Sequence, residues 1–494
     1  MRPATTPMRP LSLQSPQISA LLAITFLFPI VLCAVFFPTP GGDLREHINL
    51  GLTYRLYQFS QPPLQTWLAG AVALTGARDS WLYIAVAQAL NFIGLGYLAL
   101  IAKRFLGAGT VVPLVIMFCG GLYYAQATPS MALNADQIQV PLWAGIVYHG
   151  LAALHDNRWR DWLACGVLLG LCVIAKYTVL LLVGAIIVAL ALTPAYRKAF
   201  ANPRFYVAGL ASLPIIALHA VPELSRGYSL EYASIQFRPH ASFRARAYEF
   251  WQFLRSYVIY GSPILIGMAE VIRRRAVGIG PLPQEPAARF IVLIVVLCIG
   301  ALLVMIGGFG LRYETRHSFP LFGLSLLALL TVLRFDPPGI RPFANVMLAL
   351  WIAILVGAVV YSQVAINRLL REPAPAGALS LRAAWDRQFG CGPAYIIGDD
   401  RSARGIAINF GRPTVGLGFE DTARADWLDN EQLTRLGAIV ATTPEVAVTP
   451  HATAWLKGRT PETLMLPYRR TFRSERHTYV YVFLAPQGCP AVTK

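Results

Sequence analysis

Long apolar stretches separated by short polar connections occupy the first three quarters of the chain. The first stretch holds roughly 20 residues, which is the length an α-helix needs to cross a bilayer. Ten further stretches follow, at the helical rather than the strand length scale. The pattern predicts an α-helical polytopic membrane protein with about eleven transmembrane helices, at about residues 17–37, 80–102, 109–127, 138–154, 161–175, 178–194, 205–222, 250–272, 289–309, 318–334 and 343–363.

The chain becomes polar from about residue 367, and the pattern changes to short strands. Residues 394–400 and 437–442 are predicted strands, residues 379–389 a helix, and Arg470 to Phe483 a hairpin. We therefore expect two domains, a transmembrane domain over residues 1–366 and a small α/β domain over residues 367–494. A single Gly-Asp-Asp follows the first strand without the glycine spacing of a dinucleotide fingerprint, so no cofactor is expected there.

Two connections are too long to be simple turns. Residues 38–76 contain Leu44 to Phe59, whose apolar positions recur near helical spacing and predict an amphipathic helix lying on the membrane surface. Pro62 and Pro63 break the chain before a second short helix over residues 65–74. Residues 223–249 are rich in arginine and aromatic residues, which fits a substrate lid and a basic loop on lipid headgroups equally well.

Composition agrees with a membrane protein. Of the 494 residues, 56% are hydrophobic and 14% are charged. The net charge of +17 comes from 42 Lys and Arg against 25 Asp and Glu. Many of these basic residues lie in loops beside apolar stretches, where they fix orientation and contact anionic headgroups, so no nucleic acid is expected as a partner.

The basic loops also predict orientation. If the polar head with Arg2 and Arg9 is cytoplasmic, five further basic loops fall on the same side of the membrane; they contain Lys103, Arg158, Arg197, Arg273 and Arg334. This predicts a bacterial inner-membrane protein with a cytoplasmic amino terminus and a periplasmic carboxyl-terminal domain. Cys391 and Cys489 are the two cysteines of that domain, and they are expected either to form one disulfide or to be two free thiols.

Ionisable residues interrupt the apolar pattern on the predicted outer side. Asp43 follows the first stretch, with Glu46 and His47 one helical turn further on, and Asp136 precedes the fourth stretch. A carboxylate there could accept a proton or bind a divalent cation, although a loop aspartate is common. An acid so close to hydrocarbon as Asp136 is costly unless it is paired or used.

Cations occur on the same side. Lys176 lies between two apolar stretches, where it could bind a phosphate or extend to the interface. Arg312 and Arg316 are four residues apart and would share a face if helical, which suits a phosphate clamp. The alternative is an Arg–Glu network around Glu314.

The order of these features resembles a known family. The first external Asp43 is followed by Pro62-Pro63-Leu64, then by Asp136 and by Lys176-Tyr177-Thr178, with an arginine-rich outer loop and a tail domain later. In this order the chain resembles the GT-C membrane glycosyltransferases related to protein O-mannosyltransferases and lipid A aminoarabinose transferases, over roughly residues 20–330. One departure is that Leu44 follows Asp43, where many relatives have a second acid.

The resemblance implies transfer of a sugar from a polyprenyl-phosphate donor to a lipid, glycan or protein acceptor on the outer face, by an inverting displacement. Asp43 would be the catalytic base, with a divalent cation as a candidate partner, and Asp136 the second catalytic acid. Lys176, Arg312 and Arg316 would bind the donor phosphate, supported by Glu46 and His47. Neither the sugar nor the acceptor follows from these residues.

Three other readings compete. A transporter would bring charges toward one cavity but usually shows repeated halves and broken helices at mid-membrane. A flippase or polymerase of lipid-linked surface glycans would share a lipid-phosphate site but usually lacks such a tail domain. A receptor built around the tail leaves Asp43, Asp136 and Lys176 unexplained.

Overall fold

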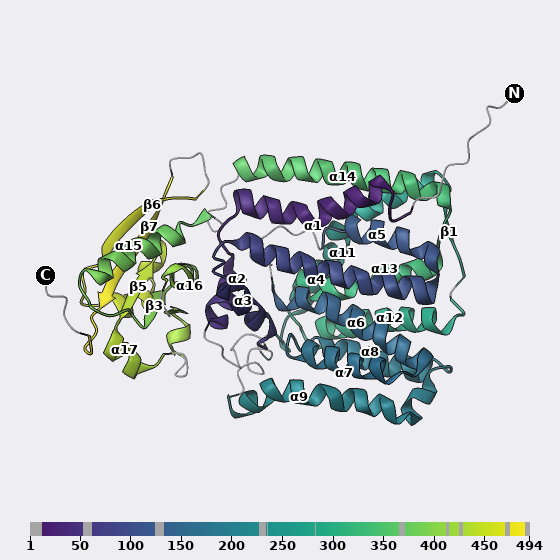
Figure 1. Ribbon diagram of the computed structural model, residues 1–494, viewed down its shortest axis with the longest axis horizontal. Helices are drawn as coiled ribbons and strands as arrows, with labels where there is room; N and C mark the ends of the chain where they lie inside the picture. The colour runs from purple at the N-terminus through teal and green to yellow at the C-terminus, as the bar shows by residue number, and fades with distance from the viewer. Residues whose placement is uncertain are drawn as a thin grey trace.

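The computed structural model describes residues 12–52, 62–123, 133–226, 234, 236–281, 283–364, 371–411, 414–423, 428–469 and 475–489. A body of long helices carries an α/β domain at one end, and Figure 1 shows the two helices α2 (Gly42–Gly51) and α3 (Leu64–Leu74) between them. The predicted boundary between residues 366 and 367 lies outside the described residues.

A helix lies in each of the eleven predicted apolar stretches. These helices form the helical body and are α1 (Pro16–Phe36), α4 (Ser80–Ile101), α5 (Val111–Gly120), α6 (Ala135–Asp156), α7 (Trp159–Val173), α8 (Val179–Leu192), α9 (Pro203–Arg226), α11 (Phe243–Arg273), α12 (Pro286–Gly307), α13 (Phe319–Val332) and α14 (Pro337–Val364). Among the described residues, six segments are long and apolar enough to cross a membrane, at Pro16–Phe36, Ser80–Leu106, Pro203–Leu224, Pro286–Gly307, Thr315–Val332 and Gly339–Val360. The α-helical membrane class is confirmed, whereas the count of about eleven spans is not.

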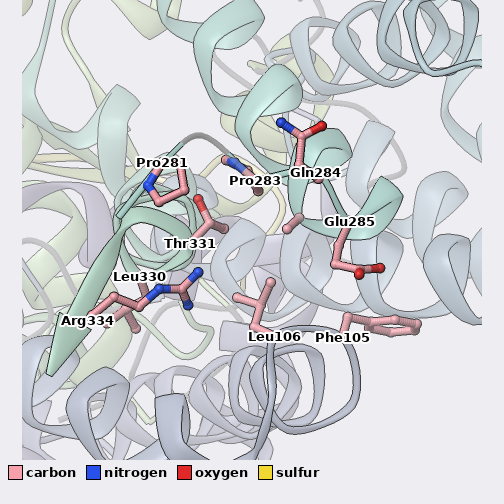
Figure 2. A pocket seen from close by; sticks show the side chains of 10 residues that line it. Phe105, Leu106, Pro281, Pro283, Gln284, Glu285, Leu330, Thr331 and Arg334 are labelled. Atoms are coloured by element: carbon pink, nitrogen blue, oxygen red, sulfur yellow. The ribbon is translucent and has the colours of Figure 1, made fainter. Parts of the chain in front are cut away.

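The end of the helical body opposite the α/β domain has its own features. β1 (Val277–Ile279) and β2 (Leu333–Phe335) form an antiparallel ribbon there. A cavity of about 270 Å³ beside it is lined mainly by apolar and proline side chains, together with Glu285 and Arg334 (Figure 2). It lies beyond the far ends of α4 and α13, so it is separate from the polar cluster described below.

The carboxyl-terminal domain contains a five-stranded sheet in the order β4-β3-β5-β7-β6. Its strands are β3 (Tyr395–Gly398), β4 (Val415–Gly418), β5 (Ala438–Thr442), β6 (Glu462–Pro467) and β7 (Arg476–Leu484). β3 runs parallel to β4 and β5, and β7 runs antiparallel to β5 and β6.

Helices cover both faces of this sheet. Side chains of α15 (Ala374–Asp386) and α16 (Asp400–Asn409) pack with Ile396 and Ile439 on one face. Ile397 and Val440 point the other way and pack with α17 (Asn430–Leu436) and α19 (Pro450–Leu456), as the two-residue repeat of a strand requires. The predicted α/β class of this domain is confirmed.

The predicted hairpin was placed too late in the chain. It pairs β6 with β7, so its first strand ends at Pro467, before residue 470. β6 is an edge strand whose residues are mostly exposed, with Leu464 and Leu466 half-buried, and this weak alternation hides it in the sequence. Residues 470–474 lie outside the described residues.

The predicted amphipathic helix forms as α2 and is buried between the two domains. α2 ends at Gly51, and residues 53–59 of the predicted helix are outside the described residues. Leu44 and Ile48 pack in an apolar cluster with α3 and α4. α2 and α3 meet backbone to backbone, because a Cβ on Gly70 would lie 2.7 Å from the carbonyl carbon of Gly51. The polar face of α2 therefore contacts protein rather than water, and a position of this helix at the membrane surface stays a prediction.

Candidate functional site

The first turn of α6 holds a buried carboxylate at the end of the helical body nearest the α/β domain. Asn134 is the N-cap, and its side chain accepts a hydrogen bond of 2.8 Å from the backbone N–H of Gln137. Asp136 follows in the first turn, where the helix dipole favours a negative charge. Its side chain is only 2% exposed, so it depends on partners from other elements.

Lys176 is that partner. α7 ends at Val173, and the chain turns back before α8, which places Lys176 opposite Asp136. The ammonium donates to both carboxylate oxygens, at 2.7 and 2.8 Å. Gln139 supports the same turn, because its Oε1 accepts a hydrogen bond of 2.9 Å from Thr178 Oγ1. Lys176 is thus a half-buried ion-pair partner of Asp136.

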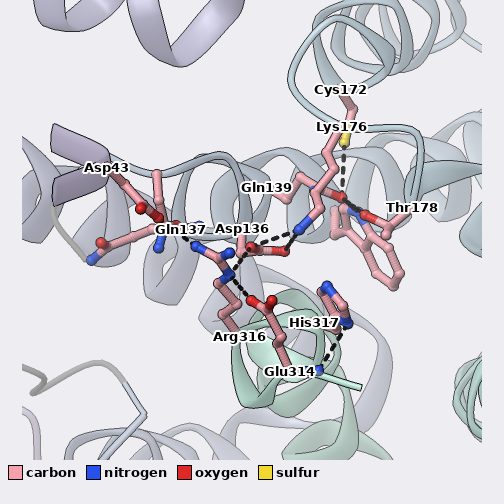
Figure 3. A network of polar contacts seen from close by, with 12 residues as sticks. Asp43, Asp136, Gln137, Gln139, Cys172, Lys176, Thr178, Glu314, Arg316 and His317 are labelled. Atoms are coloured by element: carbon pink, nitrogen blue, oxygen red, sulfur yellow. Dashed lines mark hydrogen bonds and ion pairs between the residues drawn. The ribbon is translucent and has the colours of Figure 1, made fainter. Parts of the chain in front are cut away.

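Arg316 joins this pair to two further carboxylates, as Figure 3 shows. The 3₁₀ helix Thr315–Ser318 is capped by Glu314, whose carboxylate also accepts from Arg316 Nε at 2.5 Å. Arg316 Nη1 donates to Asp43 Oδ2 at 2.5 Å, and its Nε lies 3.8 Å from Asp136 Oδ2. One guanidinium therefore links carboxylates from α2, α6 and the segment before α13.

The two aspartates of this cluster differ in access to solvent. The Asp43 side chain is 42% exposed, in contrast to the buried Asp136. Three carboxylates, on Asp43, Asp136 and Glu314, face the two cations of Lys176 and Arg316. When all five are ionised, the cluster has one excess negative charge, and Asp43 is its most accessible acid.

Arg312 does not share a helix face with Arg316. Residues 312–314 are not helical, so the spacing of four does not align the two side chains. The Arg312 side chain is exposed, and its backbone N–H donates to Gln236 O at 2.9 Å. Within the described part of the chain it makes no ion pair with the cluster, and Arg312 as a ligand of the donor phosphate stays a prediction.

Glu46 and His47 follow Asp43 on α2 but point to different partners. Glu46 Oε2 lies 3.2 Å from Arg404 Nη1 of the α/β domain. His47 is buried, and its Nδ1 lies 3.3 Å from Thr66 Oγ1 of α3. Burial lowers the pKa of His47 to about 4, helped by the charges of Arg316 and Arg404 and opposed by Asp43. His47 is therefore neutral at pH 7 and cannot serve as a cationic phosphate ligand.

The residues around Asp43 do not form an obvious metal centre. Across the described ranges, no three His, Cys, Asp or Glu side chains are grouped so as to hold a metal ion. The nearest charged partner of Asp43 is the guanidinium of Arg316.

Sequence reasoning missed Gln139 and Thr178 as parts of the site and treated Glu314 only as an alternative partner for arginine. Thr178 belongs to the Lys176-Tyr177-Thr178 motif, which is the only signal that could have indicated it. Gln139 lies one turn after Asp136 and carries no separate signal. Cys391 and Cys489, in contrast, form the expected disulfide, with their Cα atoms 5.8 Å apart.

Comparison with known proteins agrees with this arrangement. Residues 60–221 match the family model described as dolichyl-phosphate-mannose-protein mannosyltransferase. This range includes Asp136 and Lys176. No curated protein sequence matches the chain significantly.

Solved structures show the same fold. The crystal structure of ArnT from Cupriavidus metallidurans in the apo state has a TM-score of 0.60 at 13% identity, over 94% of this chain and 97% of that chain. The same ArnT bound to undecaprenyl phosphate gives a TM-score of 0.61 at 13% identity, with the same coverage.

The fold and the family match define the class of protein. The match to ArnT extends over both the helical body and the α/β domain, because it covers 94% of this chain. The chain is a multi-pass membrane protein with the fold of ArnT, and it is similar to the mannosyltransferase family over residues 60–221, about one third of its length.

Proposed function

We propose that this chain transfers a sugar from a polyprenyl-phosphate donor to a hydroxyl or amine of a lipid, glycan or protein acceptor. The observation that carries the proposal is the cluster in which an accessible carboxylate, Asp43, lies beside the two cations Arg316 and Lys176. We place the reaction at the outer face of a bacterial inner membrane, with the amino terminus cytoplasmic and the α/β domain periplasmic.

Support for the donor comes from chemistry and from similarity. Guanidinium and ammonium groups are the side chains that bind phosphate best, and both lie at the end of the helical body where a lipid headgroup would be found. The similar ArnT has been solved with undecaprenyl phosphate bound. A polyprenyl phosphate is therefore the donor carrier that we propose.

Lys176 and Arg316 are the proposed phosphate ligands. Each already pairs with carboxylates, so the phosphate must share their donors rather than find free ones. A guanidinium has five N–H donors and an ammonium has three, which leaves capacity for a second anion. When the bond between the sugar carbon and the phosphate oxygen breaks, its electron pair goes to that oxygen, and both cations stabilise the growing charge.

Asp43 is the proposed general base. A phosphate that takes up the Arg316 Nη1 donor would free Asp43 Oδ2, which could then accept the proton from the acceptor nucleophile. The acceptor would attack the sugar from the face opposite the leaving phosphate, so the configuration at that carbon inverts. Donor binding would thereby prepare the base for the second substrate.

Asp136, predicted as catalytic, has a different proposed role. Its carboxylate is buried and both oxygens hold Lys176, so it is poorly placed to receive a proton from an acceptor. We infer that it holds the ammonium of Lys176 in place for the donor phosphate.

The experiment is a transfer assay with purified protein and radiolabelled polyprenyl-phosphate sugars, with and without membrane extract as acceptor. The proposal expects release of polyprenyl phosphate that depends on the extract. A divalent cation at Asp43 remains a prediction of the sequence, checked in the same assay by adding a chelator. Saturable binding of the lipid without turnover of any donor would contradict the transferase reaction.

A further inference from the structure

α2 contacts both domains of the protein through residues within three turns of each other. Asp43, in its first turn, pairs with Arg316 of the helical body. Arg45, Glu46 and Asn49 all pair with residues of the α/β domain or the segment leading into it. The proposed base therefore lies on the same ten-residue helix that receives the α/β domain.

The Arg45 contact is fully buried. Its Nη1 donates to Glu372 Oε2 at 2.5 Å and to the backbone oxygen of Arg401 at 2.6 Å. Glu372 also accepts a hydrogen bond of 2.9 Å from Tyr479 of β7. Burial acts to raise the pKa of Glu372, but the charges of Arg45 and His477 and the two hydrogen bonds outweigh it, and the pKa lies below its usual value. Glu372 is thus ionised, and the ion pair joins α2 to the central sheet.

The Glu46 contact connects α2 to the same sheet through Arg404 and Asp421. Arg404 of α16 reaches Glu46 Oε2 at 3.2 Å and Asp421 Oδ2 at 2.8 Å. Asp421 in turn accepts a hydrogen bond of 2.9 Å from the backbone N–H of Gly418, at the end of β4. Glu46, predicted as support for the site, therefore lies at the interface between α2 and the α/β domain.

The Asn49 contact is specific in geometry. Its side-chain Nδ2 donates to Gly416 O at 2.8 Å, and its Oδ1 accepts from Gly416 N at 2.9 Å. β4 is an edge strand, so one amide side chain satisfies both free peptide groups of Gly416, as a neighbouring strand would. Such a paired contact fixes both the distance and the rotation of α2 relative to the sheet.

These three polar contacts lie around an apolar contact between α2 and α16. Ile408 of α16 packs in the same apolar cluster as Leu44 and Ile48 of α2. In the sequence, Leu44 and Ile48 lie on either side of Arg45 and Glu46. By contrast, the pair that holds the Asp43 carboxylate on the side of the helical body, with Arg316, is partly exposed, and exposed pairs stabilise little. The buried contacts with the α/β domain therefore act together with the packing of α2 on α3 in setting where α2 lies.

We propose that the α/β domain is a positioning element for Asp43, acting through Asn49, Arg45 and Glu46 of α2. The proposal rests on the proposed role of Asp43 as base. Asn49 and Arg404 are positioning residues in this scheme, because neither touches the cluster around Arg316. An α/β domain that shifts on α2 would move the Asp43 carboxylate away from the cluster.

The test compares Asn49→Asp with a matched control. In Asn49→Asp a carboxylate oxygen replaces the Nδ2 donor and faces Gly416 O, so the paired contact is lost. Asn409→Asp is the control, because Asn409 Nδ2 likewise donates to a backbone oxygen, that of Gly405, but within α16. Binding of undecaprenyl phosphate checks that each variant is folded.

The first measurement needs no turnover. Each variant is combined with Asp43→Cys, and the rate at which a charged thiol reagent modifies that position is measured. The five free cysteines described are buried or half-buried in helices, so their background is low. We expect Asn49→Asp to change the rate by about tenfold, because a buried hydrogen-bonding partner is lost, and Asn409→Asp to leave it unchanged.

The second measurement is steady-state transfer in the Asp43 background. We expect Asn49→Asp to lower kcat while the affinity for the donor lipid is kept, and Asn49→Gln to recover part of the loss. An unchanged modification rate in folded Asn49→Asp would overturn the positioning role. If Asn49→Asp changes the thiol modification rate but Asp43→Asn transfers sugar normally, the α/β domain does position residue 43, but Asp43 is not the base. Failure of the positioning role and failure of the base assignment are therefore distinguishable.

Discussion

At the scale of residues, the site is defined by how each charge is shared. Lys176 is bound by both oxygens of one buried aspartate, whereas Arg316 is shared among three carboxylates. A buried ion pair contributes little net stability, but removing one partner leaves the other charge buried alone. The two cations should therefore respond differently to mutation.

Lys176→Met should destabilise the protein by up to about 3–5 kcal/mol, since it leaves the buried Asp136 with only the more distant guanidinium of Arg316. The double variant Lys176→Met/Asp136→Leu should recover most of that loss, but not donor binding. Thermal unfolding and equilibrium binding of undecaprenyl phosphate measure the two effects. Donor affinity equal to wild type in the double variant would show that Lys176 is not a phosphate ligand.

His47 should make stability depend on pH below neutrality. Its pKa is about 4 in the folded protein and about 6.5 in the unfolded chain, so between these values the unfolded state binds more protons. Stability contributed by neutral His47 is complete above pH 6.5 and decreases as the pH falls toward 4, by about 2 kcal/mol at pH 5. Unfolding measured at pH 7.5 and 5 should show this slope in wild type and a smaller one in His47→Gln. Equal slopes would contradict it.

Sequence alone indicated Asp43, Asp136, Lys176 and Arg316, because ionisable residues beside apolar stretches are costly without a function or a partner. It could not show that Lys176 and Asp136 pair, since 40 residues and a helical turn-back separate them. Nor could it show that Arg312 and Arg316 do not share a helix face, because that depends on the backbone of residues 312–314, which is not helical. Partners brought together by folding are not encoded in local spacing.

At the scale of elements, α2 and α3 form a compact pair that positions Asp43. Their backbones are in contact at Gly51 and Gly70, so neither position has room for a side chain. The amphipathic pattern of α2 was evident from its sequence, but the partner of its polar face was not. In the sequence, Arg45, Glu46 and Asn49 have the pattern of a solvent-exposed helix face. Their partners belong to the α/β domain or the segment leading into it and are known only from the structure.

Gly70→Ala should lower stability by about 1–3 kcal/mol, because the added Cβ overpacks against the Gly51 backbone. Gly96→Ala in α4 is the matched control, since a Cβ there meets nothing within 4 Å and alanine favours a helix. Thermal unfolding of both variants checks the expectation. A Gly70→Ala protein as stable as Gly96→Ala would mean that the two helices are not in such close contact.

At the scale of the whole molecule, the fold combines a helical membrane body with a domain outside it. Apolar length and the change of period near residue 367 indicated both parts, because these signals extend over many residues. The way the parts meet could not be predicted, since it depends on a few contacts such as that of Asn49 with Gly416. The number of membrane spans also stays a prediction.

The disulfide should stabilise the α/β domain. It joins residues 98 positions apart, so its loss frees a long loop in the unfolded chain and should cost about 2–5 kcal/mol. Replacing both Cys391 and Cys489 with serine should lower the melting temperature of that domain. Cys165→Ser, which removes a free thiol of α7, is the control. No difference between the two would show that the bond does not form in the protein.

The most direct test of the account is turnover and donor binding in Asp43→Asn, measured side by side with wild type. Because Asn keeps the shape of Asp43 but cannot accept the acceptor's proton, transfer should fall at least about 100-fold. Binding of undecaprenyl phosphate should stay close to wild type, since Lys176 and Arg316 remain. Normal transfer by Asp43→Asn would contradict the assignment of Asp43 as the base.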